Sequence, residues 1–331
     1  MKFGDLPLED ALGAILAHSE VVPGGRLRKG LLLEPEHIDQ LRAAGLASVT
    51  AAELEPGDMG EDVAAQTLAE ALAKDAPGIR LSAPGTGRVN LIAEGPGVVQ
   101  LDVAAIHAAN AVNPMITIAT MPDLAQMRRG AMIATVKIIS YAVPSADVAR
   151  ACDISRAAVR LSAPQLGTAA LIVTETAAGA GDKGRDAIAA RLTALDMSLS
   201  EVVSVPHETA PLAAALGQVS SDLILILTAS ATSDSHDTGP AALRAAGGRI
   251  TRFGMPVDPG NLLFLGWLGT RPVIGLPGCA RSPALNGADW VLSRIACGIE
   301  VTPQDIAAMG VGGLLKEIPS RPMPRRGKKS V

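Results

Sequence analysis

The spacing of apolar residues changes along the chain, and each change predicts a different kind of element. From Leu8 to Leu16 apolar residues recur at helical spacing behind Asp5, a residue that can cap a helix, which predicts a helix over residues 5–20. The same reasoning predicts a strand at 26–34, a helix at 35–45, a strand at 47–54 and a helix at 59–73.

Strands are expected to dominate between residues 79 and 143, with one helix near 103–112. The strand-forming stretches are GRVNLIAE (87–94), GVVQLD (97–102), MITIAT (115–120) and MIATVKIISYAV (132–143). Helices and strands do not alternate regularly here. The pattern therefore predicts a mixed α+β region over residues 1–165. Because this half carries no obvious site of its own, we expect it to supply a dimerisation surface.

Beyond residue 166, apolar runs alternate with helical segments. The runs are AALIVTE (169–175), SEVVSV (200–205), DLILILT (222–228), RITRFGM (249–255), LLFLG (262–266) and PVIGL (272–276). Continuous Val, Ile and Leu runs separated by helices are typical of a parallel sheet covered on both faces. We therefore predict an α/β protein with a doubly wound, three-layer α/β/α domain over residues 166–302, followed at 303–331 by a short helix and a basic, Pro-rich tail.

Composition excludes one class of partner. The 331 residues are 48% apolar but only 2% aromatic, and the formal net charge is −4. Five cations lie in the last eleven residues, so the rest of the chain is more acidic still. Nucleic-acid binders need a basic footprint and aromatic platforms for stacking, and neither is expected here.

The cysteines and the apolar runs indicate a cytoplasmic protein. Three cysteines are far apart in the sequence, so neither a disulfide framework nor a zinc site is expected. The start MKFGDLPLED lacks a signal-peptide pattern. No uninterrupted apolar run approaches the roughly 18 residues that a membrane span requires.

Four loops that follow predicted strands carry the candidate chemistry. They are TAAGAGDKGRD (176–186), ASATSDSHDTGP (229–240), PVDPGN (256–261) and PGCARSP (277–283). The carboxyl ends of parallel strands meet at one edge, where such sheets bind ligands. Small residues let backbone amides face phosphate oxygens, and Lys183 and Arg281 add positive charge, so we predict a bound anion. At a turn before a helix the pKa of the Cys279 thiol could fall, as in a Cys-dependent enzyme, but the favoured interpretation is that Cys279 is a small residue that fits the turn.

These loops resemble those of molybdopterin-binding domains. GLPGCARSP (275–283) resembles their strand-turn-helix, GMPVDPGN (254–261) their neighbouring Pro-Gly turn, and LILILTASATSDSHD (223–237) stands in the place of their Gly/Ser/Thr loop ending in Asp. The chain is also similar, to about residue 305, to a bacterial subfamily of molybdopterin molybdotransferase-like proteins, often fused to a molybdenum cofactor cytidylyltransferase domain. The shared stretches are MKFG (1–4), ILAHS (15–19), TGRVNL (86–91) and ATVKII (134–139).

The resemblance implies molybdopterin binding in molybdenum cofactor biosynthesis, with transferase activity that assists metal insertion or nucleotide attachment. It implies a homodimer and a cytidylyltransferase domain or protein as partners, with Mg²⁺ as a further cofactor. The implied catalytic residues are Asp234 and Asp237, and Asp237 is also the implied metal ligand. The implied cofactor-binding residues are Thr174, Lys183, Ser230, Thr232, Ser233, Asp258, Asn261, Gly278, Cys279, Arg281 and Ser282.

Two alternatives remain open at this point. The family's Gly-Gly-Thr-Ser loop is replaced by ASATS (229–233), which favours a non-catalytic module that binds the cofactor and hands it to a nucleotidyltransferase or a molybdoenzyme. Fold does not fix function, so an unrelated sugar-phosphate or nucleotide enzyme on the same fold is the other alternative.

Overall fold

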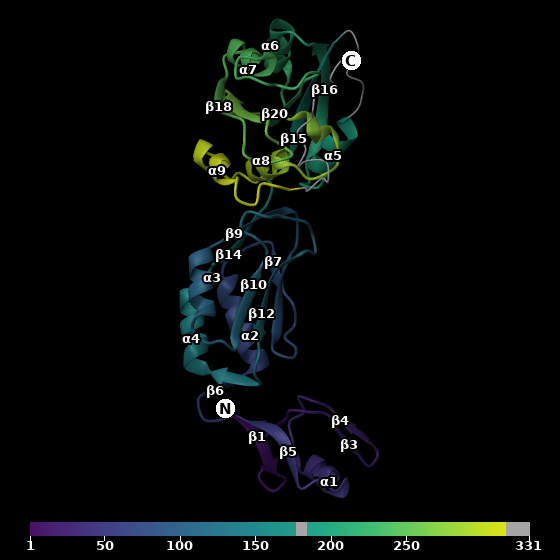
Figure 1. Ribbon diagram of the computed structural model, residues 1–331, viewed down its shortest axis with the longest axis vertical. Coiled ribbons are helices and arrows are strands. Elements are labelled where there is room, and N and C mark those ends of the chain that lie inside the picture. The colour runs from purple at the N-terminus through teal and green to yellow at the C-terminus, as the bar shows by residue number, and fades with distance from the viewer. Residues whose placement is uncertain (177–183, 316–331) are drawn as a thin grey trace, which may run out of the picture. The chain divides into compact units, whose positions relative to one another are not determined.

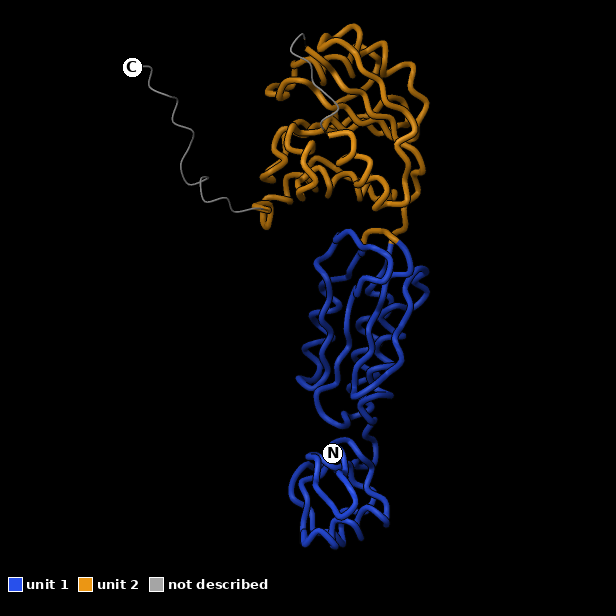
Figure 2. Tube along the Cα trace, turned by 90° about the vertical axis from the view of Figure 1, so that its right-hand side faces the viewer, with its two compact units in different colours: residues 1–95, 99–161 blue, residues 96–98, 162–331 orange. Residues whose placement is uncertain are grey.

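A computed structural model describes residues 1–176 and 184–315 and shows a mixed α/β protein (Figure 1). The chain divides into two compact units (Figure 2). Unit 1 comprises Met1–Gly95 and Val99–Leu161, and unit 2 comprises Pro96–Val98 and Ser162–Val331. Lys183, a predicted cofactor-binding residue, and the basic tail from residue 316 lie outside the described residues. Among the residues that are described, no helix is long and apolar enough to cross a membrane.

Short strands and four helices build unit 1. The helices are α1 (Pro35–Ala43), α2 (Glu61–Leu72), α3 (Val103–Asn110) and α4 (Ser145–Ile154). The strands before residue 163 are β1 (Lys2–Pro7), β2 (Ile15–Leu16), β3 (Glu20–Val22), β4 (Gly25–Leu27), β5 (Ser48–Glu53), β6 (Asp58–Gly60), β7 (Ile79–Leu81), β8 (Arg88–Ala93), β9 (Gly97–Leu101), β10 (Ile116–Thr120), β11 (Gln126–Met127), β12 (Met132–Ile138), β13 (Ala142–Pro144) and β14 (Val159–Ser162).

The predicted helix over residues 5–20 is wrong, because this segment forms β1, a turn and β2. Both strands pair with β5, which makes the sheet β1-β5-β2 antiparallel. The Thr50 hydroxyl donates to the Asp5 carboxylate at 2.6 Å, so Asp5 serves strand pairing and not a helix cap. Leu8 and Leu16 are buried, whereas Leu12 between them is 58% exposed. Pairing with the distant strand β5 therefore overrides the local helical spacing.

The other predicted elements of unit 1 are mostly confirmed. The helices at 35–45, 59–73 and 103–112 correspond to α1, α2 and α3, while α4 follows Pro144 unpredicted. The strand predicted at 26–34 ends at Leu27, because Gly30 adopts a positive φ of 85° that breaks the run. The four-stranded sheet β10-β12-β8-β7 is antiparallel, and α2 packs against β8 and β12 to bury a core of small and branched apolar residues.

Unit 2 is built on a six-stranded sheet in the order β16-β15-β17-β20-β19-β18. The strands are β15 (Thr168–Glu175), β16 (Ser198–Pro206), β17 (Leu223–Leu227), β18 (Arg249–Phe253), β19 (Phe264–Leu268) and β20 (Arg271–Leu276). The helices are α5 (Arg185–Thr193), α6 (Thr209–Gln218), α7 (Thr238–Ala245), α8 (Gly287–Ala296) and α9 (Pro303–Ala308), with a 3₁₀ turn η1 (Gly278–Arg281) before α8. Each predicted apolar run of this half became a strand.

The prediction that all strands of this sheet are parallel is wrong for β19. β16, β15, β17 and β20 are parallel, but β19 is antiparallel to both β20 and β18. A buried apolar run looks the same in either direction, so the sequence pattern does not reveal the reversal. Two antiparallel pairings restore the direction of β18, so β15, β17, β18 and β20 all end at the same edge.

The helices of unit 2 pack against the strands of this sheet. α6 and α7 contact each other and cover one face, where their leucines meet Ile172, Ile226 and Phe264 in a buried core. α5 packs against β16 and α8 against β20. Figure 1 shows α6 and α7 above the sheet in that view, with α5 and α8 below. α5 also packs against η1 at the shared edge.

Candidate functional site

Thr174, at the end of β15, links two of the candidate loops. Its side chain is fully buried, and its hydroxyl accepts a hydrogen bond from the Ala229 amide at 2.9 Å. The same hydroxyl lies 2.8 Å from Nδ1 of His207, a residue just after β16 that no motif singles out. Since the hydroxyl accepts from Ala229, it can donate its proton to His207. Thr174 therefore positions the start of the loop after β17.

The loop after β17 presents a row of backbone amides. The Thr228 hydroxyl donates to the Ser230 carbonyl at 2.7 Å and lies 3.2 Å from the Thr232 hydroxyl, which holds the loop in a tight curve. Within the described residues, the amides of Ser230, Ala231 and Thr232 donate to no acceptor. Successive unpaired amides in a curved loop are a common binding site for anions.

Arg281 brings positive charge to this loop. Its Nη2 donates to the Thr228 carbonyl at 3.0 Å, and burial lowers the pKa of the guanidinium below its ordinary value. An arginine nonetheless stays protonated at neutral pH. Gly184, at the end of the loop after β15, has a φ of 115°, and a Cβ there would lie 2.9 Å from Cγ of Arg281. Three of the four loops thus meet at Arg281.

The two predicted catalytic carboxylates are committed to local contacts. Asp237 caps α7: one oxygen accepts from the Thr238 amide at 2.7 Å and the other from the Ser233 amide at 3.0 Å. The Asp234 carboxylate accepts from the amide and the ring of His236, which lowers the pKa of Asp234. The side chain of Asp234 is 70% exposed.

These carboxylates do not form a metal centre in the described parts of the chain. There, the one group of three close His, Cys, Asp or Glu ligands is formed by Glu34, Glu36 and His37, at the start of α1 in unit 1. Magnesium needs several oxygen ligands in near-octahedral geometry. The described residues around Asp237 do not fit that requirement.

An arginine that the sequence did not single out holds the GCARSP turn. Arg191 of α5 donates to the carbonyls of Ala280 at 2.9 Å and of Ser282 at 2.8 Å, and also to that of Ala284. Its Nε donates to the carboxylate of Asp289 on α8. The turn holding Gly278, Cys279 and Ser282 is therefore tied to two helices. The available signal was weak: Arg191 follows the buried Ile188 by one helical step, which places it toward the inside.

The turn after β18 is fixed against the start of α8. The Met255 amide donates to the Asn261 carbonyl at 3.0 Å, which closes the turn. Gly260 has a φ of 143°, and a Cβ there would lie 2.7 Å from the Gly287 nitrogen, so only glycine permits this approach. Asp258, which precedes a cis peptide bond, is half-buried, while the Asn261 side chain is exposed.

Cys279 lies near the turn after β18, and its thiol does not have the lowered pKa of a reactive cysteine. Burial raises the pKa of this thiol, and the nearby Asp258 carboxylate raises it further. Arg191 acts in the opposite direction but does not prevail. The electrostatic effect of Asp258 shows that the two turns are close to each other. No lowering at a helix start occurs, because Cys279 lies within the short 3₁₀ turn η1, well before α8 begins at Gly287, and its thiol is partly buried.

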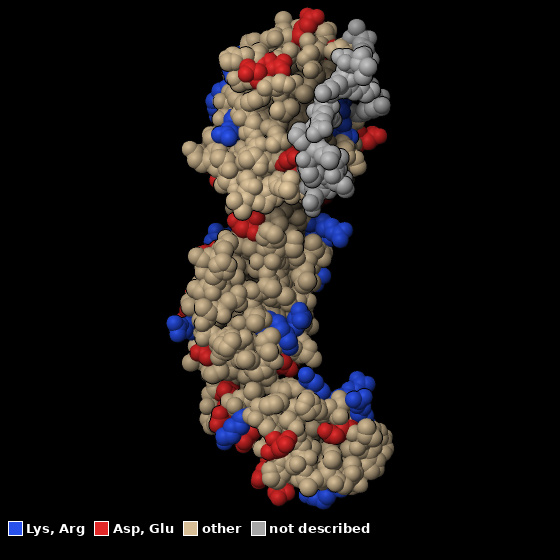
Figure 3. Space-filling model, viewed as in Figure 1, with Lys and Arg blue, Asp and Glu red and all other residues tan. Residues whose placement is uncertain are grey.

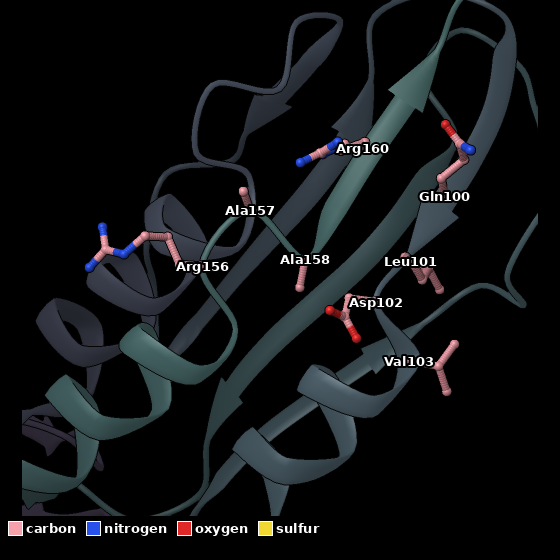
Figure 4. A pocket seen from close by; sticks show the side chains of 8 residues that line it. All are labelled: Gln100, Leu101, Asp102, Val103, Arg156, Ala157, Ala158 and Arg160. Carbon is pink, nitrogen blue, oxygen red and sulfur yellow. The ribbon is translucent and has the colours of Figure 1, made fainter.

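A surface hollow of about 540 Å³ in unit 1 is a weaker candidate. It lies around the start of α3, where Asp102 caps the helix by accepting from the Ala105 amide at 2.9 Å. Figure 4 shows the side chains of Arg156 and Gln100 at opposite sides of the labelled group, and they do not point toward each other. Arg156 pairs with Asp153 at 3.0 Å. The polar groups of this hollow therefore do not converge on one point.

Comparison with known proteins gives matches to part of the chain and distant similarities. A model of a domain of unknown function (DUF8806) matches residues 5–53. No curated protein sequence matches. One similar solved structure is the molybdopterin biosynthesis moea protein of Pyrococcus horikosii, at 12% identity and TM-score 0.32, covering 90% of this chain and 75% of that one.

Two further solved structures carry related descriptions. A molybdopterin biosynthesis protein of Mycobacterium abscessus is 13% identical with TM-score 0.28, and the match covers 40% of this chain and 92% of that one. A molybdenum cofactor biosynthesis protein of Pyrococcus furiosus is 13% identical with TM-score 0.22, and the match covers 89% and 61%. Scores this low do not place the chain in a fold family, so its function has to be inferred from its own residues.

Proposed function

We propose that unit 2 binds molybdopterin through the loops after β15, β17, β18 and β20, as part of molybdenum cofactor biosynthesis. The observation that carries this proposal is the row of unpaired amides from Ser230 to Thr232 beside Arg281. The two turns whose sequences resemble molybdopterin-binding domains lie at the same edge of the sheet. In this reading unit 2 is the three-layer α/β/α domain of that family.

The chemistry of these groups suits the ligand. Molybdopterin carries a terminal phosphate, which the amides and the Arg281 guanidinium would bind through charge-assisted hydrogen bonds. Its pterin ring presents N–H donors, and the half-buried Asp258 carboxylate is an acceptor at the edge of the same site. Ser282, exposed at the end of η1, would add a hydroxyl.

A binding or handover module is the form of this function that the geometry favours over a metal-dependent transferase. Both oxygens of Asp237 accept backbone hydrogen bonds, and Asp234 is bound to His236. These hydrogen bonds hold each carboxylate in its own turn, and the described residues bring no group of three His, Cys, Asp or Glu ligands together there. We propose that the chain presents the cofactor to a partner cytidylyltransferase, and that molybdopterin binds without Mg²⁺.

A homodimer formed through unit 1 is part of the proposal. Most of the exposed large apolar side chains lie in unit 1, including Phe3, Val63, Met115, Met132 and Ile139. These side chains are the candidate association surface, because exposed apolar groups are those that a dimer interface buries. Sedimentation of the purified chain at several concentrations tests this: a mass that stays monomeric throughout contradicts it.

The ligand is tested by titrating the full chain with molybdopterin and following pterin fluorescence. Arg281→Gln and the double variant Asp258→Ala/Ser282→Ala should each weaken binding about tenfold or more, because they remove charge-assisted contacts. Arg249→Gln is the matched control, since Arg249 begins β18 at the opposite edge of the sheet. Absence of binding by the unaltered chain would contradict the proposal.

Turnover separates the handover module from the transferase. The full chain is incubated with molybdopterin and molybdate, or with a nucleoside triphosphate, with and without Mg²⁺, and the pterin is analysed by mass spectrometry. We expect an unchanged pterin in every case. A product that requires Mg²⁺ and disappears in Asp237→Ala would instead favour the transferase.

A further inference from the structure

The β3–β4 hairpin of unit 1 carries a hollow lined by cations. Its volume is about 560 Å³, and its lining is formed by Ser19, Arg26, Arg28 and Lys29. Figure 3 shows Lys and Arg side chains gathered over this hairpin. All four residues lie within the matched domain of unknown function, and none belongs to the proposed molybdopterin site.

Strand register places three of these residues on one face. Glu20 pairs with Leu27 and Val21 with Arg26 in the antiparallel hairpin. Leu27 is buried, whereas Val21 is 76% exposed, so the face holding Val21 and Arg26 is the solvent face. Side chains alternate along a strand, which puts Ser19 and Arg28 on that face as well.

Two of the cations have no acidic partner. Within the described residues, neither Arg26 nor Arg28 pairs with a carboxylate. Both guanidinium groups are exposed at the same small surface. Bringing like charges together is unfavourable unless an anion neutralises them.

Lys29 and Ser19 complete the lining in a fixed arrangement. The Lys29 amide donates to the Ser19 hydroxyl at 3.0 Å, which leaves the hydroxyl proton able to donate outward. The Lys29 ammonium lies 5.8 Å from the centre of the Tyr141 ring, a cation–π distance. Burial raises the pKa of Glu61, a carboxylate that Lys137 contacts at 3.7 Å, and the charges of Lys137 and Lys29 oppose this rise, so Lys29 is partly compensated.

We propose that this hollow binds the phosphate groups of a small phosphate ester or diphosphate. Guanidinium forks, an ammonium and a hydroxyl donor are the groups that recognise phosphate oxygens. The lining offers no aromatic face for a base, since Lys29 lies over the Tyr141 ring. Recognition therefore comes from phosphate charge, and it does not depend on the function proposed for unit 2.

Inorganic pyrophosphate is the probe, titrated into the full chain by calorimetry at low ionic strength. The double variant Arg26→Gln/Arg28→Gln should weaken binding about tenfold or more, since two charge-assisted contacts are lost. The double variant Arg26→Lys/Arg28→Lys keeps the positive charge and should lose less pyrophosphate affinity than the Gln double variant. Arg128→Gln/Arg129→Gln changes the net charge equally at exposed positions elsewhere in unit 1 and should leave binding unchanged.

Several outcomes would overturn the proposal. One is the absence of pyrophosphate binding by the unaltered chain. Another is equal weakening in the Arg128→Gln/Arg129→Gln control, which would indicate a non-specific effect of net charge. A loss confined to Arg281→Gln would place the pyrophosphate on unit 2. Binding of a single-stranded oligonucleotide that pyrophosphate does not displace would assign the hairpin to nucleic acid instead.

Discussion

Arg191 on α5 and Asp289 on α8 form an ion pair whose side chains are only 11% and 12% exposed. The same arginine donates to three carbonyl oxygens of the turn that follows β20. Asp289 in turn accepts from the Asn286 amide at the start of α8. One pair of residues thus fixes the turn holding Gly278, Cys279 and Ser282.

Replacing Arg191 should destabilise unit 2. Arg191→Met leaves the Asp289 carboxylate without its cation in a largely buried place, and we expect the free energy of unfolding to fall by about 3 kcal/mol. Both tryptophans, Trp267 and Trp290, lie in unit 2, so their fluorescence during urea unfolding reports on this unit.

The matched control for Arg191→Met is Arg185→Met on the same helix. Arg185 is exposed, and a surface change of this kind should alter the free energy of unfolding by no more than about 0.5 kcal/mol. Similar losses in the two variants would show that Arg191 has no special role in holding the turn.

Gly260 should not tolerate a side chain. In Gly260→Ala, the new Cβ would lie 2.7 Å from the Gly287 backbone nitrogen, and φ would stay positive, which costs about 1–3 kcal/mol before the clash is counted. Gly269→Ala also has a positive φ, of 61°, but meets no atom within 4 Å. Urea unfolding followed by tryptophan fluorescence should give a clearly lower free energy of unfolding for Gly260→Ala than for Gly269→Ala. Equal stability would mean that the close approach to α8 is not needed.

Cys279 should react slowly with iodoacetamide at neutral pH. Its pKa is raised above the ordinary value of 9.0, so the thiolate fraction near pH 7 is smaller than for an exposed cysteine. The alkylation rate of Cys279 should therefore keep rising as the pH passes 9. The pKa of Cys297 is raised to about 11, so its alkylation rate should rise at higher pH still. Peptide mass spectrometry after timed alkylation measures each site. A Cys279 that reacts at pH 7 as fast as in the urea-unfolded chain would contradict this.

Asp222 should stabilise unit 2 near neutral pH, and this stabilisation should be lost in acid. One of its oxygens accepts from the Gly167 and Thr168 amides and the Thr168 hydroxyl, which lowers the folded-state pKa below 3.8. A carboxyl with a lowered pKa contributes stability above its unfolded value of 3.8, and this is lost as the pH falls through the folded value. Unfolding measured from pH 7 down to about pH 3 should show a shallower decline in Asp222→Asn. An identical decline in both chains would contradict the prediction.

The elements of unit 2 could be predicted well because its strands are continuous apolar runs with clear ends. The run LILIL at β17 is buried at every position, as expected for a central strand or a buried helix. Five residues are too few for a typical helix, so the length of the run favours a strand. The gathering of the four loops also follows from strand direction. The reversal of β19 could not be predicted, because direction depends on pairing with β18 and β20 and not on composition.

Sequence reasoning failed where a residue's partner lies far along the chain. Asp5 looked like a helix cap, but its partner is Thr50 on β5. Arg191 carries no motif at all, and its importance comes from contacts with residues about 90 positions later. Residue type suggested the chemistry, while only the fold shows which groups are already engaged.

The reversal of β19 divides the candidate edge into two kinds of loop. After β18 the chain turns at residues 256–261, where Gly260 closely approaches Gly287 at the start of α8, and re-enters the same sheet as β19, so an insertion there would disturb this close contact. The loops after β15 and β17 lead instead into α5 and α7, and extra residues in them would leave every strand pair in place. Among related chains, variation in loop length should therefore concentrate after β15 and β17, and redesign for a different ligand should begin there.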